Sequence, residues 1–178
     1  MTTHSDEAGR SGVAPFVRTA RPDDALGIAR MHWESHQATY IESGLVTRER
    51  IEAWTLDQRI EGWSRVLDDA TSPARTVVVA VEGERILGFA DARAVDLALE
   101  PDAPRDLELK GLYLLGARQG SGLGQALLDA AIGDRPAYLW AMAGETRARA
   151  FYRRNGFEPD GTEAPFEPWD VMTVRLVR

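Results

Sequence analysis

Hydrophobic positions repeat along this chain with the spacing of helices in four places. Spacings of three and four residues join one set of positions into a stripe that predicts a helix of about four to five turns: Ala25, Ile28, Ala29, His32, His36 and Tyr40. Residues 51–67 also show helical spacing, with breaks that the pattern does not fix. Two further helices are predicted over residues 125–132 and 146–154, the second ending at Asn155-Gly156.

Runs of apolar and β-branched residues predict the strands. Residues 76–81 and 86–92 flank a turn and predict an antiparallel hairpin. Shorter or more mixed runs predict strands over 16–20, 107–115, 137–142 and 171–177. In the run 107–115 the polar start predicts exposure and the apolar end predicts burial. The order of elements predicts one mixed sheet of the α/β or α+β class, in a single domain over residues 15–178 after a loose tail, residues 1–14.

Composition and charge narrow the function classes. The chain has 178 residues, enough for one sizeable core, and no apolar stretch near the roughly 20 residues of a membrane span or the apolar segment of a secretory signal. A net charge of -7 argues against a general nucleic-acid binder, which needs a basic face. No cysteine is present, which removes thiolate chemistry and fits a reducing compartment, so we expect a cytoplasmic protein.

A glycine-rich turn joins the predicted strand 107–115 to the helix that follows it. Gly120, Gly122 and Gly124 allow close approach of bare backbone, and the start of a helix offers free N–H groups, so this turn suits an anion. Neither the dinucleotide fingerprint nor a phosphate-binding P-loop fits, because Gln125 stands where the former needs glycine and no Gly-Lys-Ser/Thr follows. On its own the turn is equally compatible with a tight connection that only needs glycine.

Two landmarks together resemble a known family. Gln119-x-x-Gly122-x-Gly124 is similar to the acyl-CoA signature of the GNAT superfamily of N-acetyltransferases, and Phe151-Tyr152 followed by Gly156-Phe157 resembles its second landmark, an aromatic pair on a helix before glycine and phenylalanine. The resemblance implies a mostly antiparallel sheet of six to seven strands, splayed between the fourth and fifth strands, with helices on both faces. It covers about residues 16–178 and is strongest over 107–157.

The resemblance implies acetyl-CoA as the acyl donor and assigns its contacts. The pyrophosphate would rest on backbone amides of Gln119, Gly120, Ser121, Gly122, Leu123, Gly124 and Gln125, and the pantetheine arm would pair with the backbone of Leu114 and Leu115. Tyr152 matches the tyrosine that protonates the leaving thiolate in many relatives, although tyrosines on short helices are often only core residues. Glu108 lies where some relatives carry a glutamate general base, and the alternative is a strand glutamate paired with Lys110.

His32 and His36 lie four apart on one predicted helix face beside Trp33 and are candidates for the acceptor pocket, with imidazole as a proton carrier. The alternative is a partly buried helix face. Their HxExH spacing has no third ligand and predicts no metal site. Trp33, Trp54 and Trp63 are candidates for an aromatic wall, or for core packing.

Two positions depart from the family pattern. Glu145 stands where many relatives have an asparagine that helps to hold the cofactor, and Gly116 replaces a common proline. A carboxylate at 145 that points inward would repel a phosphate of CoA. We expect an N-acetyltransferase that acts on a primary amine of a small molecule by direct attack. A protein N-terminal or lysine acetyltransferase and a non-catalytic acyl-CoA sensor are the alternatives, and a homodimer is expected only by analogy.

Overall fold

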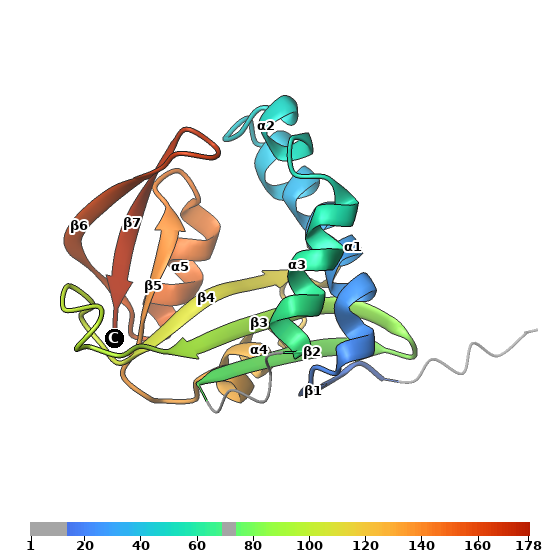
Figure 1. Cartoon of the computed structure of the whole chain (residues 1–178), viewed down its shortest axis with the longest axis horizontal. Helices are drawn as coiled ribbons and strands as arrows, with labels where there is room; N and C mark the ends of the chain where they lie inside the picture. The colour runs from blue at the N-terminus through green and yellow to red at the C-terminus, as the bar shows by residue number, and fades with distance from the viewer. Residues whose placement is uncertain (1–13, 69–73) are drawn as a thin grey trace, which may run out of the picture.

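The computed structural model describes residues 14–68 and 74–178, which form one seven-stranded sheet with helices on both faces (Figure 1). The strand order is β1-β2-β3-β4-β5-β7-β6, and every neighbouring pair is antiparallel except β4 and β5. This architecture confirms the expected fold class. The tail expected over residues 1–14 lies, up to residue 13, outside the described residues. In the part that is described, no helix is long and apolar enough to cross a membrane.

The strands are β1 (Phe16–Thr19), β2 (Arg75–Glu82), β3 (Arg85–Ala94), β4 (Leu107–Leu114), β5 (Tyr138–Met142), β6 (Glu158–Phe166) and β7 (Val171–Val177). Six of them match the predicted strands. The seventh, β6, has no signal in the sequence because it carries two prolines and is mostly exposed. It tolerates them because it is an edge strand that pairs only with β7.

The helices are α1 (Ala25–His36), α2 (Arg48–Glu52), α3 (Leu56–Asp68), α4 (Leu123–Ala131) and α5 (Thr146–Arg154), with short 3-10 turns η1 (Pro22–Asp24) and η4 (Gly116–Arg118). Figure 1 shows α1 and α3 side by side on one face of the sheet and α4 on the other. The predicted helix from Ala25 to Tyr40 is interrupted, because the chain continues after His36 as a π-helix, η2 (Gln37–Ile41). Tyr40 nevertheless stays buried.

The exposure predicted for β4 is wrong. Its polar start is buried, Glu108 included, because β3 and β5 pair with it from both sides there. Lys110, in contrast, is exposed. The apolar end is half-buried at Leu112 and Tyr113, where β5 no longer pairs with β4, and buried at residues 114–115 as predicted.

The sheet opens between β4 and β5 at a definite residue. The two parallel strands pair only at Glu108 with Tyr138 and at Leu109 with Leu139. On the other side of β4, the register against β3 shifts so that Asp91 faces Gly111 and Ala92 faces Leu109, which leaves Lys110 as an extra residue. Such a bulge bends its strand. The bend at Lys110 coincides with the end of the pairing to β5, so β4 and β5 diverge from this point.

Beyond the bulge, β3 and β4 remain in tight contact at Gly88. An added Cβ at this position would lie 2.6 Å from the backbone oxygen of Tyr113 and 2.7 Å from Cδ1 of Leu114. Neither distance is compatible with a side chain in the present backbone. Glycine at this position therefore fixes how closely β3 supports the free end of β4.

We expect Gly88→Ala to lower the free energy of unfolding by about 1–3 kcal/mol, because the strands must move apart to admit the methyl group. Urea unfolding followed by circular dichroism measures the change. Gly116→Ala is the matched control, since its Cβ would meet nothing within 4 Å and its φ is not in the left-handed region. Equal unfolding midpoints for the two variants would contradict the tight contact.

Candidate active site

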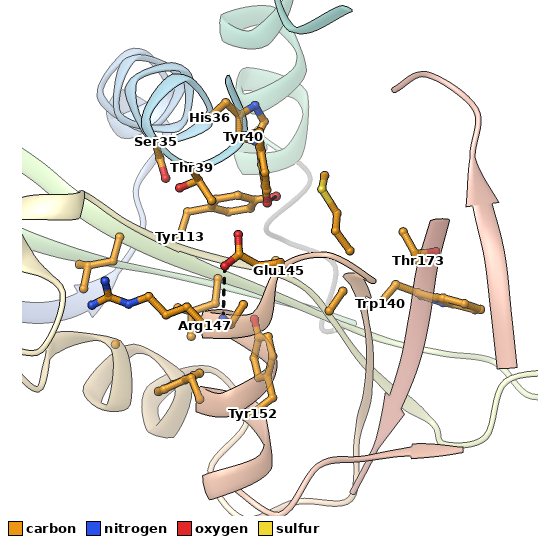
Figure 2. A pocket seen from close by; sticks show the side chains of 18 of the residues that line it. Ser35, His36, Thr39, Tyr40, Tyr113, Trp140, Glu145, Arg147, Tyr152 and Thr173 are labelled. Atoms are coloured by element: carbon orange, nitrogen blue, oxygen red, sulfur yellow. Dashed lines mark hydrogen bonds between the residues drawn. The ribbon is translucent and has the colours of Figure 1, made fainter. Parts of the chain in front are cut away.

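A cavity of about 890 Å³ occupies the opening between β4 and β5. Its walls come from α1 and η2, the free end of β4, the turn before α4, the end of β5 with α5, and the β6–β7 hairpin. Figure 2 shows side chains from these segments converging on one space, with Tyr40 and Tyr113 facing Glu145, and Tyr152 on α5, the helix that Glu145 precedes. The split of the sheet thus produces a site to which distant parts of the sequence contribute.

The glycine-rich turn presents unpaired amides at one end of this cavity. Gly120 and Gly122 have φ values of 82° and 87°, in the left-handed region that glycine adopts most easily. The backbone N–H groups of Gly120, Gly122, Gly124 and Gln125 find no hydrogen-bond partner within residues 14–68 and 74–178. Because α4 starts here, the helix dipole adds to these donors. The turn therefore fits an anion held by backbone alone, and five of its residues line the cavity: Gln119, Gly120, Gly122, Gly124 and Gln125.

Ser121 and Leu123, which the resemblance places among the phosphate contacts, do not line the cavity. The Ser121 hydroxyl donates to the Arg118 carbonyl at 2.6 Å, and the Leu123 side chain is buried in the core. Gln125 lies at the rim, where its amide donates to Asp129 and Asn155 at 2.8 Å each and so links α4 to the end of α5. Ser121 and Leu123 therefore shape the turn, whereas Gln125 both braces α4 and lines the cavity.

The free edge of β4 faces the cavity with alternate residues. The N–H of Leu115 donates to the Leu87 carbonyl on the β3 side at 2.9 Å, and its own carbonyl accepts from Arg118 at 2.8 Å. Since successive residues of a strand turn their backbone groups to opposite sides, Leu112 and Leu114 direct theirs toward the gap left by β5. The prediction for Leu115 is therefore corrected: Leu114 belongs to the open edge, Leu112 joins it, and Leu115 faces the other strand.

Tyr152 lies on α5 and lines the cavity although it is only 7% exposed. Burial raises the pKa of its phenol, and the charges of Tyr113 and Glu145 raise it further, so the group is protonated at neutral pH. Its hydroxyl makes no hydrogen bond to another residue in the described ranges. A protonated, unpaired phenol in a cavity is a suitable proton donor.

Glu108 lines the same cavity, but both of its carboxylate oxygens are already in ion pairs. Oε2 accepts from Nε of Arg93 at 2.7 Å and Oε1 from Nζ of Lys110 at 3.2 Å. Arg93 also makes two hydrogen bonds to Glu100. The carboxylate is 4% exposed and ties β3 to β4 next to the bulge. Two alternatives follow from the sequence for Glu108, a general base or a strand glutamate paired with Lys110, and the structure contains the pair.

Of the three acceptor-site residues predicted on α1, His32 and His36 line the cavity and Trp33 does not. Trp33 instead lies against the guanidinium of Arg59, whose Cζ is 5.0 Å from the ring centroid. Among the other tryptophans of the expected aromatic wall, Trp54 lines the cavity and Trp63 packs in the core against Phe89.

The histidines cannot carry protons near neutral pH as the sequence analysis expected. Burial, helped by the charge of Arg59, lowers the pKa of His32 to about 3. The pKa of His36 is also lowered, by burial first and then by His32 and Arg59. Nη1 of Arg59 lies 3.1 Å from Nδ1 of His36, and a guanidinium only donates, so this nitrogen accepts and the proton of the neutral ring is on Nε2.

Arg59 is a buried cation that contacts His36 and the rings of Trp33 and Trp54. Its side chain is fully buried, donates to the carbonyls of Ile51 and Trp54 at 3.2 and 3.1 Å, and stacks between the rings of Trp33 and Trp54. No carboxylate in the described part of the chain pairs with it. Burial lowers the pKa of Arg59 to about 10. It holds α2 and the segment before α3 against the end of α1, a role that no sequence signal indicated.

Four further residues complete the cavity. Tyr40, Tyr113 and Trp169 contribute aromatic rings, and Glu145 contributes a carboxylate. Sequence reasoning placed Tyr40 on the helical stripe and noted Glu145 as a departure, but assigned neither to the acceptor side. No local pattern marks Tyr113 or Trp169, which reach the site from a strand and a loop far apart in the sequence.

Comparison with known proteins agrees with this geometry. A family model described as an acetyltransferase (GNAT) domain matches residues 73–159. Uncharacterized N-acetyltransferases of Mycobacterium bovis and Mycobacterium tuberculosis are each 30% identical over 105 residues, which is 56% of this chain and 63% of each relative. Over this part of its length the chain is similar to the GNAT superfamily. The match spans less than two thirds of the length of these relatives.

Solved structures show the same fold. The PaiA N-acetyltransferase of Thermoplasma acidophilum, solved in complex with coenzyme A, superposes with a TM-score of 0.68 at 17% identity, covering 93% of this chain and 100% of that one. An acetyltransferase from Thermus thermophilus gives a TM-score of 0.60 at 20% identity over 93% and 97% of the two chains. The GNAT match at 73–159 includes the glycine turn, the β4 edge, Glu145 and Tyr152, whereas α1 and Trp169 lie outside it.

The buried histidines predict that the folded chain loses stability in mild acid. In the folded state both remain neutral, whereas in the unfolded chain each binds a proton below its ordinary pKa of about 6.5. Their contribution is therefore complete above that pH and is lost as the pH falls from about 6.5 toward the folded value of about 3 for His32. With two protons, we expect the slope of the unfolding free energy to approach about 2.7 kcal/mol per pH unit below pH 6.

His32→Phe tests this effect and is expected to reduce that slope by about half, because one of the two protons is removed. Urea unfolding at steps from pH 7 to pH 5 measures it, a range in which most carboxylates stay ionised. The wild-type chain is the reference, and superimposable pH profiles for the two proteins would contradict the neutral state of the buried imidazole.

Proposed function

We propose that this chain transfers an acetyl group from acetyl-CoA to a primary amine of a small molecule. The observation that carries the proposal is the convergence of three features on one cavity: unpaired amides at the start of α4, an unpaired β4 edge, and the buried phenol of Tyr152. Each feature meets one demand of acyl transfer from a CoA thioester.

The donor fits these residues without cationic side chains. The amides of Gly120, Gly122, Gly124 and Gln125 suit the pyrophosphate, since anions bind readily at a helix start. The pantetheine arm would take the place that β5 vacates and pair with Leu112 and Leu114. The net charge of -7 is no obstacle, because the binding donors are local backbone groups.

The reaction needs one nucleophile and three proton transfers. The acceptor, protonated in water, first loses a proton; its nitrogen then attacks the thioester carbon, the C–N bond forms and the C–S bond breaks. A second proton leaves the nitrogen, and Tyr152 supplies one to the thiolate, so the products are an amide and CoA thiol. An N–H of the β4 edge can stabilise the oxyanion, a contribution that is worth about 3–4 kcal/mol in other acyl transfers.

The acceptor is proposed to be a small molecule because side chains from several elements surround its side of the cavity. Aromatic residues of α1 and η2 and residues of the β6–β7 hairpin both line it. The negative net charge also favours a cationic acceptor over an acidic one.

Tyr152→Phe tests the proposed activity. We expect kcat to fall by about 10²-fold or more, with the affinity for acetyl-CoA unchanged, because the ring remains and only the proton donor is lost. Release of CoA thiol across a panel of amines measures turnover, and calorimetry measures binding. Tyr138→Phe is the control, since this tyrosine is buried on β5 and does not line the cavity.

If the wild-type chain bound acetyl-CoA but released no thiol with any amine, the proposed activity would be wrong and an acyl-CoA sensor would be supported. Turnover by Tyr152→Phe at the wild-type rate would leave the transfer in place but remove Tyr152 as the proton donor.

Glu108 as general base stays a prediction, and its two ion pairs weigh against it. We expect Glu108→Gln to lower the free energy of unfolding by about 1–3 kcal/mol, because Arg93 and Lys110 lose a charged partner that is buried. At a temperature well below unfolding, kcat/KM should change less than tenfold. Thermal unfolding and thiol release measure the two effects. A loss of kcat of about 10²–10⁴-fold with unchanged stability would establish the base role instead.

A further inference from the structure

Glu145 places a carboxylate without a cationic partner in the acceptor side of the cavity. It precedes α5, where Oε1 accepts from the backbone N–H of Ala148 at 3.4 Å. Within the described ranges it makes no ion pair. Figure 2 shows the nearby guanidinium of Arg147 extending away from it. In this respect Glu145 is the opposite of Glu108, whose two oxygens are both paired.

Aromatic side chains surround the same space. Tyr40 and Tyr113 face Glu145 in Figure 2, and their hydroxyls lie 3.5 Å apart. The Trp169 ring is 5.3 Å from Tyr40 and 4.8 Å from His36, centroid to centroid. The negative charge of Glu145 also contributes to the raised pKa of Tyr40, Tyr113 and Tyr152, in keeping with its proximity to all three.

We propose that Glu145 binds the ammonium group of the acceptor and so selects primary amines that carry an apolar or aromatic body. This inference rests on the proposed acetyl transfer. A carboxylate together with the faces of aromatic rings is the combination that recognises an organic cation. His36, the histidine of this wall, is neutral, so it does not compete with the ammonium for Glu145.

The rest of the acceptor side fits the body of such a molecule. Trp140 and Met142 on β5 and Phe166 at the end of β6 line the cavity beyond Glu145. Phe166 is 41% exposed and can be covered by a ligand. An apolar group placed there is removed from water, which stabilises binding.

The phosphates of the donor are excluded from this position by charge. Glu145 occupies the start of α5, where the helix dipole would otherwise favour an anion, and fills it with the protein's own carboxylate. The unpaired amides at the start of α4 remain for the pyrophosphate. The concern raised by the sequence, that an inward carboxylate at 145 repels a phosphate of CoA, thus becomes a means of directing the phosphates to α4.

Glu145→Asn tests the proposal, because asparagine keeps a helix-capping oxygen and removes the charge. The acceptors are phenethylamine, a cation at neutral pH, and aniline, which is uncharged there. We expect kcat/KM for phenethylamine to fall by about 10–100-fold, mainly through KM, while that for aniline changes less than threefold. KM for acetyl-CoA should not rise, because the variant removes a charge that repels its phosphates. Glu145→Asp should recover part of the loss. Glu84→Gln, in the exposed β2–β3 turn, removes the same charge far from the cavity and is the control.

Equal losses for both acceptors, or no loss for either, would overturn the role of Glu145 while the proposed transfer stands. If the wild-type chain acetylates neither amine, binding decides: phenethylamine added to the protein with CoA should raise the unfolding temperature of the wild type and not that of Glu145→Asn. The absence of a shift in the wild type would overturn the ammonium site, and a shift without turnover would support it while the proposed function fails.

Discussion

The site depends on how briefly β4 and β5 pair. Two residue pairs, at Glu108 and Leu109, hold the parallel strands together, and the bulge at Lys110 then turns β4 away. An unpaired strand edge normally invites aggregation, and proteins cover or shorten such edges. Here the edge lies inside the fold, between α1 on one side and α5 on the other, where only a molecule that enters the cavity can reach it. The opening of the sheet is therefore at once the cavity, the edge for the donor arm and the approach to Tyr152.

Buried charges support this opening. Glu108 joins Arg93 on β3 to Lys110 at the bulge, and Arg75 holds Asp91, the residue of β3 opposite the shift, with hydrogen bonds of 2.6 and 2.8 Å. On the far side Arg59 joins α2 to the end of α1, through the carbonyls of Ile51 and Trp54 and through His36. Glu108, Arg93, Lys110, Asp91 and Arg75, the charged groups around the bend, therefore all have partners within the protein. Glu145 is left as a carboxylate in the cavity without a cation, which gives the site a defined sign at that end.

Sequence reasoning succeeded where function depends on local structure and failed where it depends on register. Short stretches of sequence determine the glycine turn, the helix of Tyr152 and the predicted strands, so these features could be predicted without knowledge of the fold. The direction of the Leu115 backbone could not be predicted in this way. A shift of one residue in register changes the side of β4 to which an amide points, and the bulge that sets the register has no sequence signal. The burial of Arg59 and the meeting of Tyr40, Tyr113 and Trp169 likewise arise from contacts between segments far apart in the chain.

The two ends of the cavity differ in electrostatic character, and in the proposed reaction this difference would order the two substrates. At the α4 end, unpaired N–H groups and the helix dipole favour the anionic part of the donor and disfavour an ammonium. At the α5 end, a carboxylate has taken the corresponding position and reverses the preference. Tyr152 lies on α5, seven residues after Glu145, which precedes that helix, and both residues line the cavity, so the proposed proton donor and the proposed ammonium site share one space. The orientation of both reactants follows from charge before any shape-specific contact is made.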